Sequence, residues 1–143
     1  MSEDEEDLTP RFKTSYDFVD FFQVTHAILD ENHNVIPVRS WQEWSEWSEK
    51  AYQKTGISLR RVAETTINGW WVSTVFLGLN HGFGGPPLWF ETMVFEDKDS
   101  PPPPETGNKI HALLNEMQWR YATWTEAKEG HETIVEMIRC GLF

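Results

Sequence analysis

The chain has little cysteine, few basic residues and no long apolar run, and each shortage argues against a class of protein. Its single cysteine, Cys140, cannot form an internal disulfide, which argues against a disulfide-stapled secreted domain. No apolar run reaches the roughly 18 residues that a membrane-spanning helix needs. The N-terminus is acidic, whereas a signal peptide begins with basic and then apolar residues. We therefore expect a cytoplasmic protein without a membrane segment.

Acidic residues outnumber basic ones. The 143 residues contain 12 Lys and Arg against 23 Asp and Glu, and the formal net charge is −11. The acidic run from Glu3 to Asp7 carries part of this charge, but the rest of the chain is acidic as well. Such a surface repels phosphate backbones, so the sequence predicts no direct nucleic-acid binding. An acidic surface keeps a protein soluble, and it can also bind the basic clefts of nucleic-acid enzymes.

Aromatic residues are abundant and indicate a folded domain. They make up 14% of the chain, whereas disordered chains contain few. The length fits one domain with a core of its own. We expect residues 1–14 to be a disordered acidic tail and residues 15–143 to be a single domain. Four consecutive prolines, Pro101 to Pro104, predict an exposed Pro-rich loop over residues 97–108.

Hydrophobic spacing and turn residues predict an α+β fold, namely an antiparallel β-sheet with the helices packed on one face. Asn68-Gly69 between two β-rich runs is a strong hairpin signal. Ser40 with Glu43, and Thr123 with Glu126, form capping boxes that each open a helix. The predicted strands span residues 25–30, 34–39, 59–67, 70–79, 88–96 and 118–122. The predicted helical segments span residues 15–22, 40–54, 109–115 and 123–140.

Two blocks of the sequence are distinctive. They are VSTVFLGLNHGFGGPPLWFETMVFE at residues 72–96 and RYATWTEAKEGHETIV at residues 120–135. With the upstream segment AILDENHNVIPV, they resemble a widespread family of small uncharacterised proteins from tailed bacteriophages and prophages. The resemblance covers most of residues 27–138 and implies a phage origin and expression inside a bacterial host cell, but no activity. Asn80 departs from the family pattern, in which an aspartate is common.

Three residues have the chemistry of a metal site. His81, Glu91 and His131 would supply two imidazoles and one carboxylate if they converged. Their spacing does not require convergence, and the chain contains no motif such as HExxH or CxxC. Without convergence, His81 is a turn residue and His131 a helix residue packed on the sheet. We therefore expect no cofactor or metal, and keep a small metal-dependent hydrolase using these three residues as an alternative.

Tryptophans and carboxylates indicate a binding surface instead. Trp41, Trp44 and Trp47 recur every third residue, so they cannot all face one core. Trp70 and Trp71 are adjacent in a strand, so they point to opposite faces of the sheet. Tryptophan is enriched at interface hot spots. The residues that we expect to bind a partner are Trp47, Trp70, Trp71, Glu43, Glu46, Glu91, Phe21 and Phe22.

The sequence hypothesis is a phage-encoded, non-enzymatic binding protein that inhibits or modulates a host protein. In its sharpest form it is an anti-defence inhibitor of the anti-CRISPR kind, which places an acidic, aromatic surface in the basic channel of a nucleic-acid-processing complex. The acidic residues available for this are Glu43, Glu46, Glu49, Glu91, Glu96, Asp97 and Asp99. A structural homo-oligomer, such as a homodimer whose mate covers the tryptophan face, is a further alternative.

Overall fold

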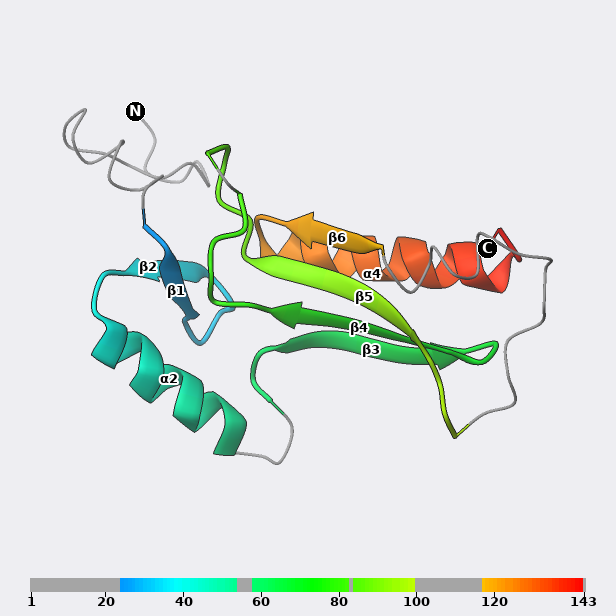
Figure 1. Ribbon diagram of the computed structural model, residues 1–143, viewed down its shortest axis with the longest axis horizontal. Coiled ribbons are helices and arrows are strands. Elements are labelled where there is room, and N and C mark those ends of the chain that lie inside the picture. The colour runs from blue at the N-terminus through cyan, green and yellow to red at the C-terminus, as the bar shows by residue number, and fades with distance from the viewer. Residues whose placement is uncertain (1–23, 54–57, 83, 100–116, 143) are drawn as a thin grey trace.

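The computed structural model describes residues 24–53, 58–82, 84–99 and 117–142 (Figure 1). The expected acidic tail, the expected first helix with Phe21 and Phe22, and the expected helical turn at residues 109–115 lie outside the described residues, as does most of the proline loop. Within the described residues, the order of elements is the predicted one. The α+β fold class is confirmed, and the described part of the chain forms two antiparallel sheets and two helices.

A small hairpin opens the described chain. Strands β1 (His26–Leu29) and β2 (Val35–Val38) pair antiparallel. Asp30 shapes their turn, because its Oδ1 accepts the backbone N–H groups of Asn32 and Asn34, each at 2.8 Å. His33 takes the left-handed conformation there, with φ 64°. The predicted hairpin is therefore confirmed.

Helix α2 (Trp41–Gln53) follows the hairpin and packs against it. Its start is capped as predicted, since Ser40 Oγ accepts the backbone N–H of Glu43 at 3.2 Å. Trp47 reaches from α2 to the end of the main sheet, where its ring packs edge-on against Phe76 with 5.6 Å between centroids. The α2–hairpin unit forms one end of the molecule in Figure 1.

The main sheet is a four-stranded antiparallel meander. Its strands lie in sequence order: β3 (Arg61–Ile67), β4 (Trp70–Phe76), β5 (Phe90–Glu96) and β6 (Gln118–Tyr121). Asn68 and Gly69 join the first two strands, with φ 50° and 82°. Both values are positive, as a two-residue type I′ hairpin turn requires. β4 ends three residues earlier than expected, because the chain turns at Gly78, whose φ is 73°.

Helix α4 (Trp124–Arg139) covers one face of this sheet, as Figure 1 shows. Its N-cap forms as predicted, with Thr123 Oγ1 accepting the backbone N–H of Glu126 at 3.1 Å. The helix buries the side chains Ala127, His131, Ile134, Val135 and Ile138. Each of them lies three or four residues from another member of the set, so together they form one stripe of the helix. None of the described helices is long and apolar enough to cross a membrane.

The core lies between α4 and the sheet, in two apolar clusters. Towards the Asn68-Gly69 turn, Trp70, Val72 and Val94 pack under the C-terminal half of α4. Towards the small hairpin, Phe76 and Phe90 pack with Trp89, Ala27, Leu29 and Ala127. Successive side chains of a strand point to opposite faces. The core therefore uses every second residue of β4 and β5, and the residues between them point to the other face.

Candidate functional site

The face of the main sheet that points away from α4 is the candidate site, and we call it the outer face. Trp71 points to this face, and so do the residues paired with it, Thr66 on β3 and Phe95 on β5. The same alternation assigns the other side chains of this face. They are Glu64, Thr66, Trp71, Ser73, Val75, Glu91, Met93, Phe95, Gln118 and Arg120. This face carries charged, polar and aromatic side chains where the α4 face carries the core.

Trp71 and Phe95 form the aromatic centre of the outer face. Their ring centroids are 5.4 Å apart with 32° between the planes. Trp71 is half-buried, and Phe95 has 36% of its surface exposed. The indole is held at its edge, because Nε1 donates to Glu64 Oε2 at 3.3 Å. Arg61 lies over the same ring, with its Cζ 5.7 Å from the ring centroid and Nη1 2.5 Å from that carboxylate.

A hollow of about 480 Å³ opens beside this aromatic pair. Its lining residues are Thr66, Trp71, Phe95, Glu96, Asp97, Lys98 and Asp99. The acidic segment is tied down, since the backbone N–H of Asp97 donates to Gly69 O at 2.9 Å. Asp97 Oδ1 in turn accepts the backbone N–H of Asp99 at 3.2 Å. The lining of the hollow thus includes two aromatic residues, three acidic residues and one lysine.

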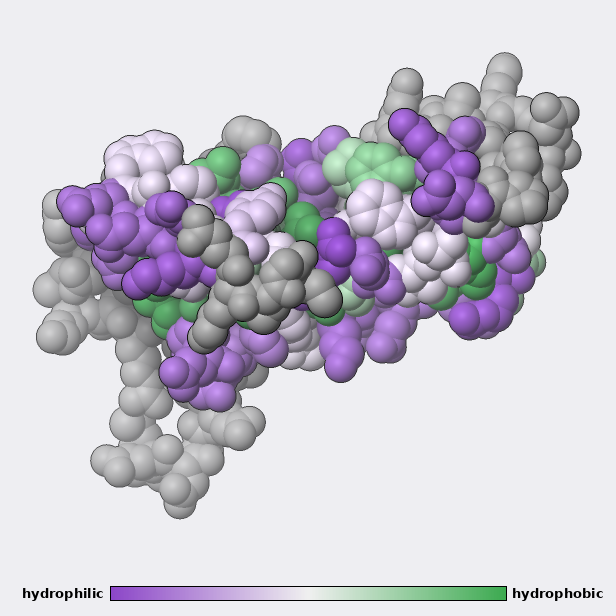
Figure 2. Space-filling view, turned by 90° about the horizontal axis from the view of Figure 1, so that it is seen from below, coloured by the Kyte–Doolittle hydropathy of each residue, from purple (hydrophilic) through white to green (hydrophobic). Residues whose placement is uncertain are grey.

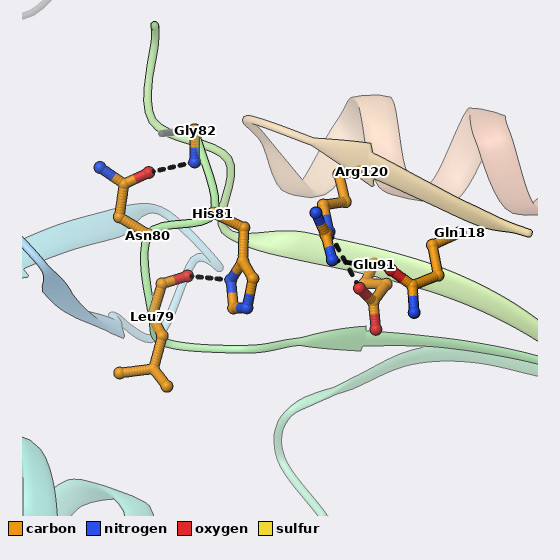
Figure 3. A network of polar contacts seen from close by, with 7 residues as sticks. All are labelled: Leu79, Asn80, His81, Gly82, Glu91, Gln118 and Arg120. Carbon is orange, nitrogen blue, oxygen red and sulfur yellow. Dashed lines mark hydrogen bonds and ion pairs between the residues drawn. The ribbon is translucent and has the colours of Figure 1, made fainter. Parts of the chain in front are cut away.

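The other end of the outer face carries an ion pair. Arg120 Nε donates to Glu91 Oε2 at 3.0 Å, and Arg120 Nη2 donates to Gln118 Oε1 at 2.7 Å (Figure 3). Glu91 is 9% exposed, so it is buried against β4 and β6 rather than presented to a partner. The prediction that Glu91 belongs to an accessible acidic surface is therefore wrong. A carboxylate this deeply placed needs a partner, and Arg120 supplies it.

The segment after β4 is held by Asn80. Its Oδ1 accepts the backbone N–H groups of Gly82 at 2.7 Å and Leu88 at 3.2 Å, which closes the connection to β5. The ring of His81 lies beside this connection, with Nδ1 3.0 Å from Leu79 O (Figure 3). His81 is thus a turn residue in contact with the backbone, in agreement with the simpler of its two sequence interpretations.

His131 lies on the other side of the sheet, beneath α4. It is 3% exposed, and its ring nitrogens are each 2.8 Å from a threonine hydroxyl, Nε2 from Thr65 and Nδ1 from Thr74. Burial lowers the pKa of His131, and the nearby charge of Glu132 opposes this only in part. A neutral imidazole bonded at both nitrogens has none left for a metal ion.

The structure therefore does not bring the predicted metal trio together. Glu91 points to the outer face and His131 to the α4 face, so the sheet itself separates them. Within the described part of the chain, no group of three His, Cys, Asp or Glu side chains could hold a metal ion. Cys140 is exposed, and the adjacent Glu136 carboxylate raises the pKa of its thiol, which opposes the thiolate form that a nucleophile needs.

The predicted tryptophans separate into core and surface. Trp70 is 4% exposed and lies in the core, so its side chain is not on the surface where a partner-binding residue was expected. Trp71 points to the opposite face, as predicted for adjacent strand residues. Trp47 is half-buried, and its ring packs against Phe76. Trp41, in the first turn of α2, is instead 64% exposed.

The predicted carboxylates on α2 are at the surface. Glu43 and Glu46 are both exposed, as expected. They lie on a different element from Trp71 and Phe95, and the described contacts do not join them into one patch. Figure 2 shows the molecule from below, where purple hydrophilic patches alternate with pale and green ones and no single green patch extends across the view. This mixture resembles an ordinary polar surface more than an obligate apolar interface.

Sequence reasoning missed Arg60, which joins α2 to the main sheet. Its Cζ lies 5.5 Å from the Trp44 ring, 5.8 Å from Trp47 and 5.9 Å from Tyr52. Its Nη2 donates to Ser48 Oγ at 2.8 Å. Burial lowers the pKa of this guanidinium, although it stays charged at neutral pH. The contacts cross from the residue before β3 to α2, so no local spacing in the sequence signals them.

Comparison with known proteins adds no relative: the chain matches no family model, no curated protein and no solved structure.

Proposed function

We propose that this chain is a non-enzymatic binding protein that docks the Trp71 end of its outer face on a basic surface of another protein. The observation that carries the proposal is the pair Trp71 and Phe95, which lies on a face that α4 does not cover and beside a hollow that the acidic segment from Glu96 to Asp99 also lines. A few residues carry most of the binding energy of an interface, and tryptophan is enriched among them. The carboxylates select a partner of opposite charge.

Long-range charge supports the same proposal. A net charge of −11 attracts basic surfaces from a distance and repels nucleic acids and acidic proteins. This attraction acts mainly on the rate of association, and it weakens as salt screens it. A basic nucleic-acid channel is the kind of surface that matches this charge.

The specific form that we propose is an anti-defence inhibitor encoded by a phage. Its support is the resemblance of residues 72–96 and 120–135 to phage proteins, together with the acidic charge. In that form the partner is a nucleic-acid-processing complex of the bacterial host. The metal-dependent hydrolase is not proposed, because the sheet separates Glu91 from His131.

The test is an affinity capture from bacterial lysate with three proteins. They are the wild-type chain, the double variant Trp71→Ser/Phe95→Ser, and Trp41→Ser as the matched control, which removes a more exposed tryptophan from α2. Capture runs at about 50 and about 300 mM salt, because the higher value screens charge steering. We expect one basic protein or complex to be enriched by wild type and Trp41→Ser at low salt, depleted at high salt, and lost with the double variant.

Two results would overturn the proposal. If the double variant captures the same partner as wild type, the outer face is not the binding surface. If Trp41→Ser alone loses the partner, the surface is α2. Light scattering of each purified protein shows whether the double variant instead breaks a homodimer, which would favour self-assembly through this face.

A further inference from the structure

We infer that two copies of this chain pair antiparallel along the outer edge of β3, which joins their two four-stranded sheets into one. β3 is an edge strand of the main sheet, and Figure 1 shows it at the lower rim. An edge strand presents backbone N–H and C=O groups to any strand that lies beside it. The inference goes beyond the proposed function and does not depend on it.

The hydrogen-bond pattern of the sheet shows which backbone groups of β3 point outwards. Gly69 O accepts the backbone N–H of the residue after β5, so every second residue of β4 from there bonds to β5. The residues between them bond to β3, as Val72 does to its partner Thr65. Glu64 and Thr66 therefore direct their backbone N–H and C=O groups away from β4. No other strand in the described part of the chain pairs with them.

The central part of β3 lacks the features that usually protect an edge strand. Residues 63–67 (AETTI) contain no proline, lysine or glycine, and the bulge of this strand comes before them, between Arg61 and Ala63. The opposite edge strand, β6, has four residues against seven in β3. The one charge in the segment, on Glu64, is already paired with Arg61 of the same chain. The segment can thus meet a copy of itself without bringing an unpaired charge to the contact.

One self-pairing register suits this segment best. Residues that pair must share a face of the sheet, so the two-fold axis passes beside a residue and not between two. An axis at Glu64 would set two carboxylates directly opposite each other and would include the bulge. An axis at Thr66 would set Glu64 opposite Asn68, whose φ of 50° is not extended. An axis at Thr65 pairs residues 63–67 throughout, and on each side of it Glu64 exchanges two backbone hydrogen bonds with Thr66 of the second copy.

The same register also buries apolar surface on the α4 side of the sheet. Ile67 then lies opposite Ala63 of the second copy, and within one chain both side chains are only partly buried. Ile67 already packs on the core cluster that contains Trp70. Pairing extends this cluster across the two-fold axis and removes apolar surface of both copies from water.

Net charge determines how this dimer responds to salt. Each copy carries a net charge of −11, so two copies repel each other at long range, and salt screens that repulsion. We therefore expect the dimer to persist or tighten between about 50 and about 300 mM salt. Docking on a basic partner weakens over the same range, so the two kinds of association are distinguishable.

The two-fold axis stands perpendicular to the joined sheet, so both outer faces lie on the same side. A dimer would then present two Trp71–Phe95 pairs to one partner, and two linked contacts hold a partner more tightly than one. This consequence alone rests on the proposed function.

Sedimentation velocity of the full chain, at micromolar to millimolar concentrations, measures the dimer directly. Thr66→Pro removes an outward N–H that is not part of the β3–β4 ladder, which an edge strand tolerates. Thr66→Val keeps this N–H and is the matched control. We expect Thr66→Val to dimerise with a dissociation constant within about threefold of wild type. Thr66→Pro should dimerise at least about tenfold more weakly, because each dimer loses two hydrogen bonds and leaves their acceptors unpaired.

Disulfide crosslinking tests the register, and it decides the matter if Thr66→Pro does not fold. In a Cys140→Ser background, Glu64→Cys and Thr66→Cys chains are oxidised separately and as a mixture. Opposite residues of a hydrogen-bonded pair have Cα atoms about 5.5 Å apart, which suits a disulfide. We expect the mixture to give a crosslinked dimer with one chain of each kind, identified by its intact mass, and each chain alone to give little.

Three results would overturn the inference. They are a wild-type chain that stays monomeric at millimolar concentration, a folded Thr66→Pro variant that dimerises like wild type, and equal crosslinking in the mixture and in the separate chains. The proposed function would be unaffected, because capture with Trp71→Ser/Phe95→Ser tests it independently. If that double variant is monomeric while Thr66→Pro is a dimer, the copies associate through the outer face and not through β3.

Discussion

The two faces of the main sheet are made by the same four strands, yet they hold their aromatic side chains in different ways. On β5, Phe90 points to the α4 face and is fully buried, whereas Phe95 points to the outer face and is 36% exposed. Phe90 packs against Phe76 and Trp124, both apolar neighbours. Phe95 packs against Trp71, which is itself held by charged groups. One face uses aromatic rings to fold, and the other keeps them available.

Polar groups show the same contrast. Under α4, a chain of hydrogen bonds crosses the sheet from Thr65 through His131 and Thr74 to Thr92, with distances of 2.6 to 2.8 Å. Strands β3, β4 and β5 each contribute a threonine to this network, and α4 contributes the histidine. The network lies between the two apolar clusters. On the outer face, by contrast, the Glu64 carboxylate beside Trp71 is exposed to solvent. A satisfied buried network fixes a fold, while exposed carboxylates serve recognition.

The largest expected effect tests this contrast on one strand. Phe90→Ala should lower the free energy of unfolding by about 3–5 kcal/mol, because it leaves a cavity in the core. Phe95→Ala should cost about 1 kcal/mol or less, because the ring is partly solvated and its loss leaves no closed cavity. Urea unfolding followed by circular dichroism measures both. Equal costs would mean that the outer face is as much a packing surface as the α4 face.

Local rules predicted much of this architecture from sequence. The Asn68-Gly69 turn, the two helix caps and the hairpin at β1–β2 depend on residues within four positions of each other, and all are confirmed. The opposite orientations of Trp70 and Trp71 follow from strand pleating alone. Periodicity could not decide which of the two tryptophans lies under α4. That depends on the contacts of Trp70 with Ile134, Val135 and Ile138 of the helix.

The candidate site was predicted less well, for a physical reason. Glu91 is buried by its pairing with Arg120, which is 29 positions away, and His131 meets Thr65 across 66 positions. Such contacts arise from strand order and helix placement, which local sequence patterns do not reveal. The hollow joins Thr66 on β3 and Trp71 on β4 to the end of β5 and the residues after it, so Trp71 can be placed beside Phe95 only once the β4–β5 register is known.

The next effect concerns a glycine on the α4 side. Gly130 lies inside α4, where alanine would normally stabilise the helix by up to about 1 kcal/mol. Here the ring of Tyr121 packs directly on the glycine, and a Cβ would come closer to the ring carbons and hydroxyl than real contacts allow. Gly130→Ala should therefore lower the free energy of unfolding by about 1–3 kcal/mol, as overpacking does.

A double-mutant cycle checks the cause. If the clash with Tyr121 is responsible, Gly130→Ala should cost little or become stabilising in a Tyr121→Ala background, which removes the ring. Lys128→Ala, at an exposed position of the same helix, serves as the control and should change stability by less than about 0.5 kcal/mol. A Gly130→Ala variant that is more stable than wild type would show that α4 stands further from β6 than the structure places it.

The smallest expected effect is the pH dependence of stability that the buried His131 produces. Because burial lowers its pKa in the folded state, the unfolded chain binds this proton more readily, and folding loses stability as the pH falls below the ordinary histidine value of about 6.5. The nearby Glu132 opposes the shift only in part. Burial also lowers the pKa of His26, so His26 changes stability in the same direction, and its contribution must be separated from that of His131.

Urea midpoints measured at about pH 7.5 and 5.5 span the histidine range. His131→Gln should be less stable than wild type at both values, since glutamine cannot reproduce both threonine contacts, but its midpoint should fall less between them. His26→Asn should retain the larger part of the wild-type fall if the network under α4 is its main source. An unchanged fall in His131→Gln would mean that the proton is taken up elsewhere, and that the α4 face differs from the outer face in packing but not in its response to pH.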